Sequence, residues 1–345
     1  MISRIKHIAI LAIVALLVSG CAVHEWPDTP EKFDLCLDLQ YSTQMTLWHH
    51  SAEGSDITEI GEGPTIDSKL ANGYMRYNIK AYPSGIMRNR NMEAVEEFTF
   101  IREIADIYNS VEKVALPAGE YDIVVWCDFL ESIGDDPFYN ANTFTSITTR
   151  KEHIGSNNYR DAFRGDVSTT IVADILDKAP DTIKVDMHRP LAKIEFVSND
   201  LSLFFKNQNL MPDTDSETSK STLLEAYSVI CNYIGFMPNT YNIITDKHTD
   251  SAVGVSFKSD IRVLKSAEAS IAFDYVLVND RQGFITIQLT LLDKDGQPIS
   301  FSEVMDVPIK RDYHTIVRGK FLTGESSGGI GVDPSFDDEF NIVLP

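Results

Sequence analysis

The residue whose position most directly indicates chemistry is Cys21, which follows an apolar run close to the start of the chain. Residues 8–18 are all apolar, and Arg4 and Lys6 precede them. This run is shorter than the roughly 20 residues that a membrane-spanning helix needs, but it fits the apolar region of a secretory signal peptide. The sequence VSGC at residues 18–21 is typical of a bacterial lipobox, in which the cysteine is acylated on sulfur and becomes the new N-terminus.

This pattern predicts a signal peptide at residues 1–20, a lipidated tether at residues 21–30, and attachment to outer-membrane lipid through acylated Cys21. Two or more acyl chains give a stable anchor, whereas one gives only marginal binding. The alternative is an ordinary signal peptide with a chance cysteine, but the order of charged, apolar and small residues favours lipidation. Glu25 and Asp28 directly after the cysteine fit an acidic surface-export signal.

Three other fragments have the residue types of a catalytic or metal site but lack its context. GESSG at residues 324–328 matches a nucleophile-elbow pattern, yet the glycine-rich stretch that follows cannot form the required helix. His49 and His50 have no carboxylate or cysteine at ligand spacing, and Asp293–Pro298 has proline where a calcium loop needs glycine, so we expect a hairpin turn there. Acidic residues are abundant, but no pair of them is singled out as an acid and base. We therefore expect no enzymatic activity, no cofactor and no metal.

The net charge and the cysteine count limit which partners and which disulfides the chain can have. The net charge of −21 argues against binding to nucleic-acid phosphates. Besides Cys21 there are only Cys36, Cys127 and Cys231, each in an apolar, strand-like context. Buried free thiols are the expected state for these three, although the sequence leaves open whether two of them form a disulfide.

The dominant periodicity of the chain is two, which predicts β-strands. Residues 34–40 alternate leucines with polar residues, placing Leu35, Leu37 and Leu39 on one face. Segments rich in β-branched and aromatic residues, bounded by turn formers, predict further strands; they lie at residues 75–82, 111–116, 121–129, 192–198 and 284–292.

Helical patterns are few, and they are short. Residues 219–230 are expected to begin with a helical turn capped by Ser219 or Ser221, and residues 172–179 are a second candidate. Many short strands with frequent turns are typical of β-sandwiches. The chain length allows two domains, and the sequence HRP at residues 188–190 before a new strand suggests a boundary. We predict an all-β fold with an N-terminal β-sandwich domain at residues 31–187 and a C-terminal one at residues 188–345.

Several motifs, taken in order, resemble those of the Bacteroidales fimbrillin-associated anchor lipoproteins. The resemblance extends through nearly all of the chain after the signal peptide; its motifs are VHEWPD after Cys21, LPAGEYDIVVWCDF (116–129), DAFRG (161–165), RPLAKIEFVSNDL (189–201), VPIKRDYHTIVRGKFLT (307–323) and GGIGVDPSFDDEFNI (328–342). It implies two tandem transthyretin-like β-sandwich domains with Greek-key topology. The triplets around Thr182 and Ser251 resemble the O-glycosylation sequence that Bacteroidales use for exported proteins.

The resemblance also implies a function at the cell surface. It suggests a non-enzymatic, lipid-anchored protein of the outer membrane, at the base of a fimbrium, that joins pilin subunits by β-strand addition. The added or accepting strand could involve residues 35–39 or 340–344, although for either segment alone an ordinary strand paired within its own domain is the favoured interpretation. The alternative function is a surface lipoprotein that binds glycans or host ligands through aromatic residues such as Trp48, Trp126 or Tyr139.

Overall fold

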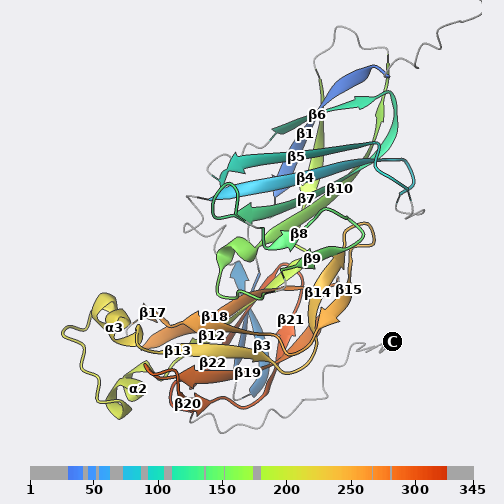
Figure 1. Cartoon of the computed structure of the whole chain (residues 1–345). Coiled ribbons are helices and arrows are strands. Elements are labelled where there is room, and N and C mark those ends of the chain that lie inside the picture. Colours follow the sequence, from blue (N-terminus) through green and yellow to red (C-terminus); the bar gives the residue numbers. More distant parts are fainter. Residues whose placement is uncertain are drawn as a thin grey trace, which may run out of the picture.

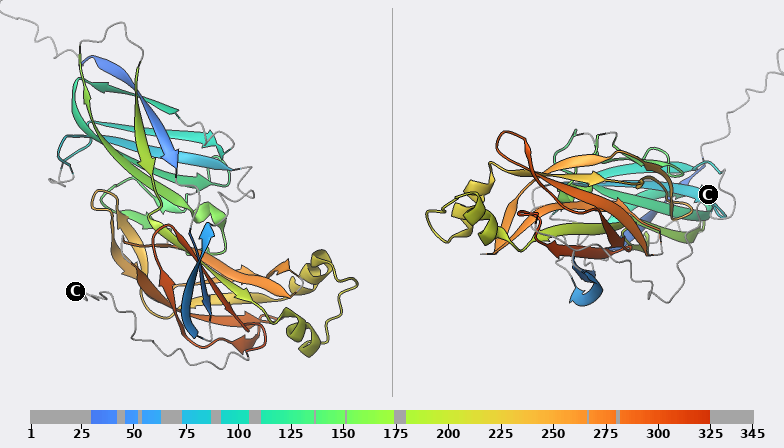
Figure 2. Two further views of the ribbon diagram at one scale, coloured as in Figure 1. Left: turned by 180° about the vertical axis from the view of Figure 1, so that it is seen from behind. Right: turned by 90° about the horizontal axis from the view of Figure 1, so that it is seen from below.

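The computed structural model describes residues 30–41, 46–51, 54–62, 73–86, 92–104, 111–135, 137–150, 152–173, 180–265, 267–279 and 282–324. Its elements are almost all strands, arranged as two β-sandwiches stacked end to end with a small sheet between them (Figure 1). The view from behind shows the same stacking (Figure 2). The predicted all-β architecture of two tandem sandwiches is confirmed.

The N-terminal sandwich packs a three-stranded sheet against a four-stranded sheet. The first has the order β11 (Asp181–Met187), β1 (Lys32–Tyr41), β6 (Val111–Pro117), and the second has the order β10 (Ala162–Ile171), β7 (Gly119–Leu130), β4 (Tyr74–Pro83), β5 (Glu96–Glu103). The short turn between β6 and β7 carries the chain from one sheet of this sandwich to the other.

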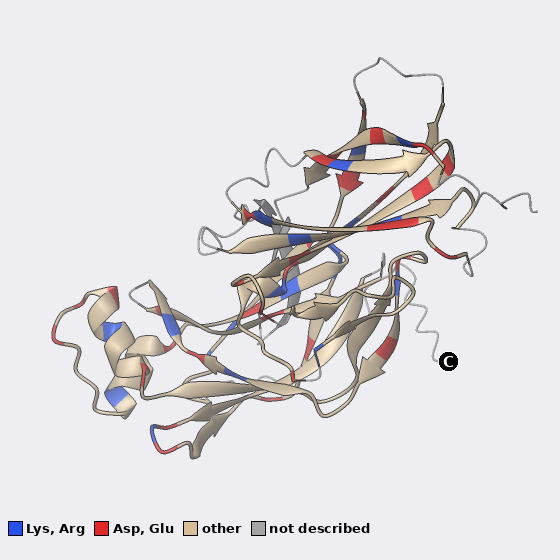
Figure 3. Ribbon diagram, turned by 45° about the horizontal axis from the view of Figure 1, so that its top comes forward, with Lys and Arg blue, Asp and Glu red and all other residues tan. Residues whose placement is uncertain are grey.

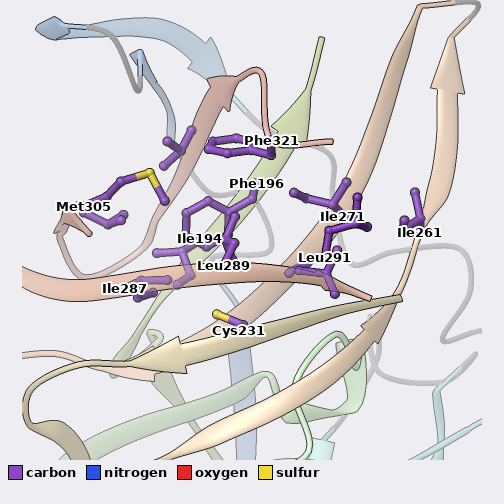
Figure 4. Close-up of a cluster of buried hydrophobic side chains, with 14 of the residues drawn as sticks. Ile194, Phe196, Cys231, Ile261, Ile271, Ile287, Leu289, Leu291, Met305 and Phe321 are labelled. Atoms are coloured by element: carbon purple, nitrogen blue, oxygen red, sulfur yellow. The ribbon is translucent and has the colours of Figure 1, made fainter. Parts of the chain in front are cut away.

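The C-terminal sandwich has two larger sheets. One has the order β17 (Arg262–Lys265), β18 (Glu268–Leu277), β12 (Leu191–Ser198), β22 (Tyr313–Gly319), β2 (Thr46–Ser51), β3 (Gly54–Glu62). The other has the order β16 (Ser256–Asp260), β13 (Ser228–Tyr233), β19 (Gly283–Leu292), β20 (Pro298–Phe301), and β21 (Met305–Ile309) also pairs with β19. Figure 4 shows the apolar core between these sheets, where Phe196 and Ile194 lie near Leu289.

The chain cannot be cut at one point into two segments that each supply all the strands of one sandwich. The hairpin β2–β3 lies within the range expected to form the N-terminal domain, yet β2 pairs in parallel with β22 of the C-terminal sandwich. The small sheet between the sandwiches likewise mixes both parts of the chain, in the order β15 (Lys247–Ala252), β14 (Met237–Asn242), β9 (Ile147–Thr149), β8 (Tyr139–Asn140). A new strand does begin at Leu191, as expected, but the domain boundary at residue 187 stays a prediction.

Three short helices complete the described structure: η3 (Asn158–Arg160), a 3-10 turn, α2 (Leu201–Asn207) and α3 (Glu217–Leu224). Helix α3 occupies the segment where a helical turn was expected, but its N-cap is Ser216, whose side chain accepts a hydrogen bond from the Ser219 amide. The capping prediction for Ser219 or Ser221 is therefore wrong by one turn, and α2 was not predicted. The other candidate helix falls largely on residues 174–179, outside the described residues. Among the described helices, none has the length and apolarity needed to cross a membrane.

The cysteines that the structure describes are free thiols. Cys127 and Cys231 are buried in the two sandwich cores, and Cys36 on β1 is half-buried. Burial raises the pKa of the Cys127 and Cys231 thiols well above the usual value, so both stay protonated and unreactive. The expectation of free thiols is confirmed.

Candidate functional site: a charged joint and an apolar edge

Strands β7 and β18 each contribute one face to a joint between the two sandwiches. The side chains of β7 alternate between two interiors. Odd-numbered residues such as Val125 and Cys127 pack into the N-terminal core, whereas Val124 and Trp126 face the joint. On β18, Ile271 packs into the C-terminal core and Tyr275 into the joint. Because both faces of each strand are covered, both strands are buried along nearly their whole length, which explains their long apolar runs.

The joint has an apolar centre of its own, separate from both sandwich cores. Its buried members are Tyr82, Ile86, Val124, Trp126, Phe138, Tyr139, Ala141, Phe144, Ile147, Ala162, Leu191, Tyr241, Ile243, Ile244, Phe273, Tyr275 and Leu277. The Trp126 ring lies edge-on to Tyr139 with centroids 5.3 Å apart. Main-chain hydrogen bonds cross the joint as well, such as that from the Ile243 amide to the Phe144 carbonyl at 2.9 Å. The two sandwiches are therefore joined by a continuous packed interior.

Asp274, in the middle of β18, is fully buried and has three side-chain partners around its carboxylate, besides the Tyr275 amide, which donates to Oδ1 at 2.8 Å. Arg160 Nε lies 2.9 Å from Oδ1, and His153 Nε2 lies 2.6 Å from Oδ2. The Tyr233 hydroxyl donates to Oδ2 at 2.6 Å. His153 and Arg160 come from the segment between β9 and β10, whereas Tyr233 and Asp274 belong to the C-terminal sandwich, so this cluster connects the two parts of the chain.

A second buried ion pair lies next to the junction of the sandwiches. Arg189 Nε is 2.9 Å from Asp161 Oδ2, and Arg189 Nη1 is 3.1 Å from Asp312 Oδ1. Arg189 and Asp161 are both buried. The Arg189 guanidinium also lies 4.6 Å from the centroid of the Phe163 ring, which gives it a cation–π contact in addition to its charge partners.

A third cluster surrounds Asp246, in the turn between β14 and β15. Arg311 Nη1 lies 2.7 Å from Oδ2, the Tyr241 hydroxyl donates to Oδ1, and Arg164 Nη1 of β10 approaches Oδ2 at 3.9 Å. Arg164 also donates to the Ile243 carbonyl at 3.1 Å. This cluster again joins a strand of the N-terminal sandwich to the C-terminal part of the chain.

The electrostatics differ among the buried carboxyl groups. Burial alone would raise the pKa of Asp274, but Arg160 and His153 outweigh burial and hold the pKa below the usual value. Burial likewise opposes ionisation of Asp246, yet the nearby His188 ring, 3.9 Å away, and hydrogen bonds from Arg311 and Tyr241 lower its pKa. At Asp161 burial wins over the attraction of Arg189, and the pKa is raised. Asp274 is thus a fully buried acid that its partners stabilise in the charged form.

An edge of the C-terminal sandwich has the opposite character. Strand β20 is the last in its sheet, and in the described part of the chain no strand pairs with its outer side. Its Ile299 and Phe301 side chains are 40% and 57% exposed, and Val304 just beyond is 47% exposed. An exposed, apolar edge strand is a natural place for another extended segment to pair.

The sequence-predicted site residues lie in separate places. Cys21 and residues 340–344 fall outside the described residues. Residues 35–38 are paired on both sides, by β11 and by β6, and Leu39 is paired with β11; the three leucines are buried, so this segment is an ordinary internal strand. Thr182 is exposed on edge strand β11, and Ser251 is half-buried on β15. Both remain predictions as glycosylation sites.

The fragments that resembled catalytic or metal sites have ordinary structural surroundings where they are described. Asp293 Oδ1 accepts hydrogen bonds from the Asp295 and Gln297 amides, which closes the predicted hairpin turn between β19 and β20. The backbone of His49 and His50 lies in β2. In the described ranges no three His, Cys, Asp or Glu side chains are grouped as metal ligands would be.

Two of the three aromatic residues considered for ligand binding are inside the molecule. Trp126 and Tyr139 are fully buried in the joint. The side chain of Trp48 lies outside the described residues. Neither buried ring can act as a platform for a glycan on the surface.

The charged groups of the joint were not identified from the sequence, although a signal for one of them is present. Asp274 interrupts the run IAFDYVLV at residues 271–278, and Asp128 interrupts VVWCDFL in the same way. A carboxylate inside such a run must be buried, and a buried charge needs a partner. For Asp128 that partner is Arg76, whose Nε donates to Oδ1 at 2.8 Å.

Several solved structures are similar to this chain. A candidate cell adhesion protein from Bacteroides eggerthii is 10% identical, with 90% of this chain and 93% of that chain covered and a TM-score of 0.43. A fimbrial assembly protein from Parabacteroides distasonis is 12% identical, with coverages of 84% and 92% and a TM-score of 0.40. The fimbrial anchor protein Mfa2 from Porphyromonas gingivalis is 12% identical, with coverages of 77% and 81% and a TM-score of 0.34.

No curated protein matches the chain. One family model does, over residues 37–345, which include nearly all of both sandwiches. The chain therefore belongs to DUF6562, a family of unknown function.

Proposed function

We propose that this protein is a non-enzymatic, lipid-anchored surface protein that serves as an anchor or minor assembly subunit of fimbriae. Acylated Cys21 would hold it to the outer membrane, with the folded part displayed at the cell surface. A pilin subunit would join it by strand addition, in which main-chain hydrogen bonds supply affinity and alternate side chains supply register. The sequence motifs that resemble fimbrillin-associated anchor lipoproteins support this role.

The observation that carries the proposal is the placement of the two ends of the molecule. The first described residues, Pro30 and Glu31, lead into β1 at the end of the N-terminal sandwich away from the C-terminal one (Figure 1). Strand β20, with its exposed Ile299 and Phe301, lies in the C-terminal sandwich. A lipid anchor before residue 30 and a partner at β20 would thus act on opposite ends, with the packed joint between them.

The surface charge is compatible with display in solvent. Acidic and basic residues are interspersed along the strands of both sandwiches in Figure 3. Several of these charges form exposed cross-strand pairs, such as Lys113 with Asp34 at 2.6 Å. The net charge of −21 keeps such a surface well hydrated.

The alternative, a glycan-binding or host-ligand-binding lipoprotein, loses support from the aromatic residues. Carbohydrate binding of this kind needs exposed ring faces, whereas Trp126 and Tyr139 are buried among the side chains of the joint. We therefore favour the fimbrial role over the glycan-binding one.

The anchoring half of the proposal is tested by Cys21→Ser in the full precursor, with Cys36→Ser on β1 as a matched control. We expect Cys21→Ser to abolish incorporation of labelled palmitate and to move the protein out of the membrane fraction, while Cys36→Ser behaves as wild type. Retention of label and of membrane association by Cys21→Ser would contradict anchoring.

The fimbrial half is tested by purification of the wild-type protein from membranes of its own cells. We expect a pilin to co-purify and deletion of the gene to release or lengthen fibres. Saturable binding to a glycan array with unchanged fibres would instead favour the alternative function.

A further inference from the structure

The outer edge of β20 is an open strand edge with apolar side chains. Ile299 and Phe301, two residues apart, lie on the same face of the strand, and both are substantially exposed. Exposed apolar edges promote pairing with other chains, and native proteins usually shorten, charge or cover them. Strand β20 is short, but residues 298–301 carry no charge.

The chain itself returns to this edge after its last described strand. Strand β22 ends at Gly319 in the opposite sheet, and the following turn brings Gly324 against β20. A Cβ at Gly324 would lie 2.6 Å from Ser300 Oγ and 3.8 Å from the Phe301 carbonyl oxygen. Gly324 also has a left-handed φ of +69°, so the close approach and the backbone conformation both require glycine here. Residues 325–345 therefore start directly beside the open edge.

We propose that residues 340–344 of the same chain cover the β20 edge as an added strand. The segment FNIVL alternates, with Phe340, Ile342 and Leu344 on one face, as a strand over an apolar surface requires. The preceding stretch from residue 325 to residue 339 contains three glycines, and at roughly 3.3 Å per extended residue it is long enough to turn back along β20.

We assign the covering strand to the chain's own segment and not to a second copy, because a tethered segment has a high effective concentration near its site. A segment tethered by a short flexible linker is present at about millimolar effective concentration near its site, far above the concentration of a second copy in solution. The covered edge would also be closed to other strands until the segment is displaced. This contact lies within one chain and does not depend on the proposed fimbrial role.

Amide hydrogen exchange of the purified full-length mature protein tests the inference without any partner. In wild type we expect the amides of residues 299–301 to be protected. Ile342→Pro removes a main-chain donor and disfavours pairing, so exchange at these amides should rise tenfold or more. Ser327→Pro, in the same tail but outside the pairing segment, is the matched control and should leave exchange unchanged.

Two results would overturn the inference. Equal exchange at residues 299–301 in wild type and Ile342→Pro would show that the segment does not cover the edge. Protection that disappears on dilution, together with a dimer by light scattering, would assign the covering strand to a second copy. An unchanged denaturation midpoint in Ile342→Pro would establish that the sandwiches stay folded; if the midpoint falls, Ile342→Lys provides the same comparison without proline.

Discussion

The joint between the sandwiches and the edge at β20 reverse the usual placement of residues in opposite ways. The joint puts charged groups such as Asp274 and Arg160 where no water reaches them, whereas the edge leaves Phe301 and Ile299 in contact with solvent. A buried charge is tolerated only when its partners stay in place, because the cost of leaving it unpaired is several kcal/mol. An exposed apolar strand costs far less and can be covered by any suitable segment.

The joint is therefore a permanent contact, whereas the β20 edge is a place to which an extended segment can be added. The Asp274 cluster requires His153, Arg160 and Tyr233 to keep one arrangement, which fixes the two sandwiches relative to each other. The β20 edge has no such requirement, since main-chain hydrogen bonds and apolar contacts accept many sequences. Variants at the two places should therefore differ sharply in their effect on folding.

Removing the charge of Asp274 should have the largest effect on stability. In Asp274→Asn the size of the side chain is kept, but Arg160 and His153 lose the carboxylate that compensates their burial. We expect a loss of about 3–5 kcal/mol in the free energy of unfolding, measured by urea denaturation.

Asp306→Asn on β21 is the matched control for this variant. Asp306 accepts a 2.7 Å hydrogen bond from Thr286 on the exposed side of the sheet, so its loss of charge should change stability by no more than about 0.5 kcal/mol. Comparable destabilisation by the two variants would mean that the buried cluster is not specially important for the joint.

The same carboxylate predicts the direction of a pH effect. The pKa of Asp274 is lowered in the folded protein, so its contribution to stability is present above the usual aspartate pKa of about 3.9 and is lost as the pH falls through the lower folded value. The stability difference between wild type and Asp274→Asn should therefore shrink below about pH 4. Urea denaturation of both proteins between neutral and acidic pH measures this difference, and a gap that widens in acid would contradict the assignment.

A smaller effect is expected from the neutral hydrogen bond beside this cluster. The Tyr139 hydroxyl donates to the Arg160 carbonyl at 2.6 Å in the interior of the joint. Tyr139→Phe keeps the ring against Trp126 but leaves that carbonyl without this donor, which should cost about 1–2 kcal/mol. A loss as large as that of Asp274→Asn, in the same denaturation experiment, would show that this neutral hydrogen bond matters as much to the joint as the charge pairing does.

Much of the fold could be predicted because strands carry their signal locally. The alternation in residues 34–40 identified a strand and its buried face correctly, and the apolar run of residues 121–129 identified β7. Which strands would share a sheet could not be read in this way. The pairing of β2 with β22 joins segments more than 250 residues apart, and no local pattern encodes that contact.

The joint was the part that the sequence analysis missed, for a related physical reason. Trp126 lies in an apolar run that is typical of a buried strand, but the sequence does not say that its face of β7 packs on a second sandwich. The partners of Asp274 come from residues 153, 160 and 233, which converge only in three dimensions. The β20 edge was missed as well, because whether a strand lies at the edge of a sheet depends on the order of strands and not on its own residues.

The smallest effect on folding is expected at that edge. Phe301 is 57% exposed, so Phe301→Thr removes few contacts within the described sandwich and keeps a residue that favours β-strands. We expect the free energy of unfolding to change by no more than about 0.5 kcal/mol. The protection of the amides of residues 299–301 by the proposed tail segment should nevertheless fall, because the apolar face of the edge loses its largest side chain. If Phe301→Thr instead destabilised the protein as strongly as Asp274→Asn, the edge would be part of the permanent interior, and the contrast between a fixed joint and an available edge would fail.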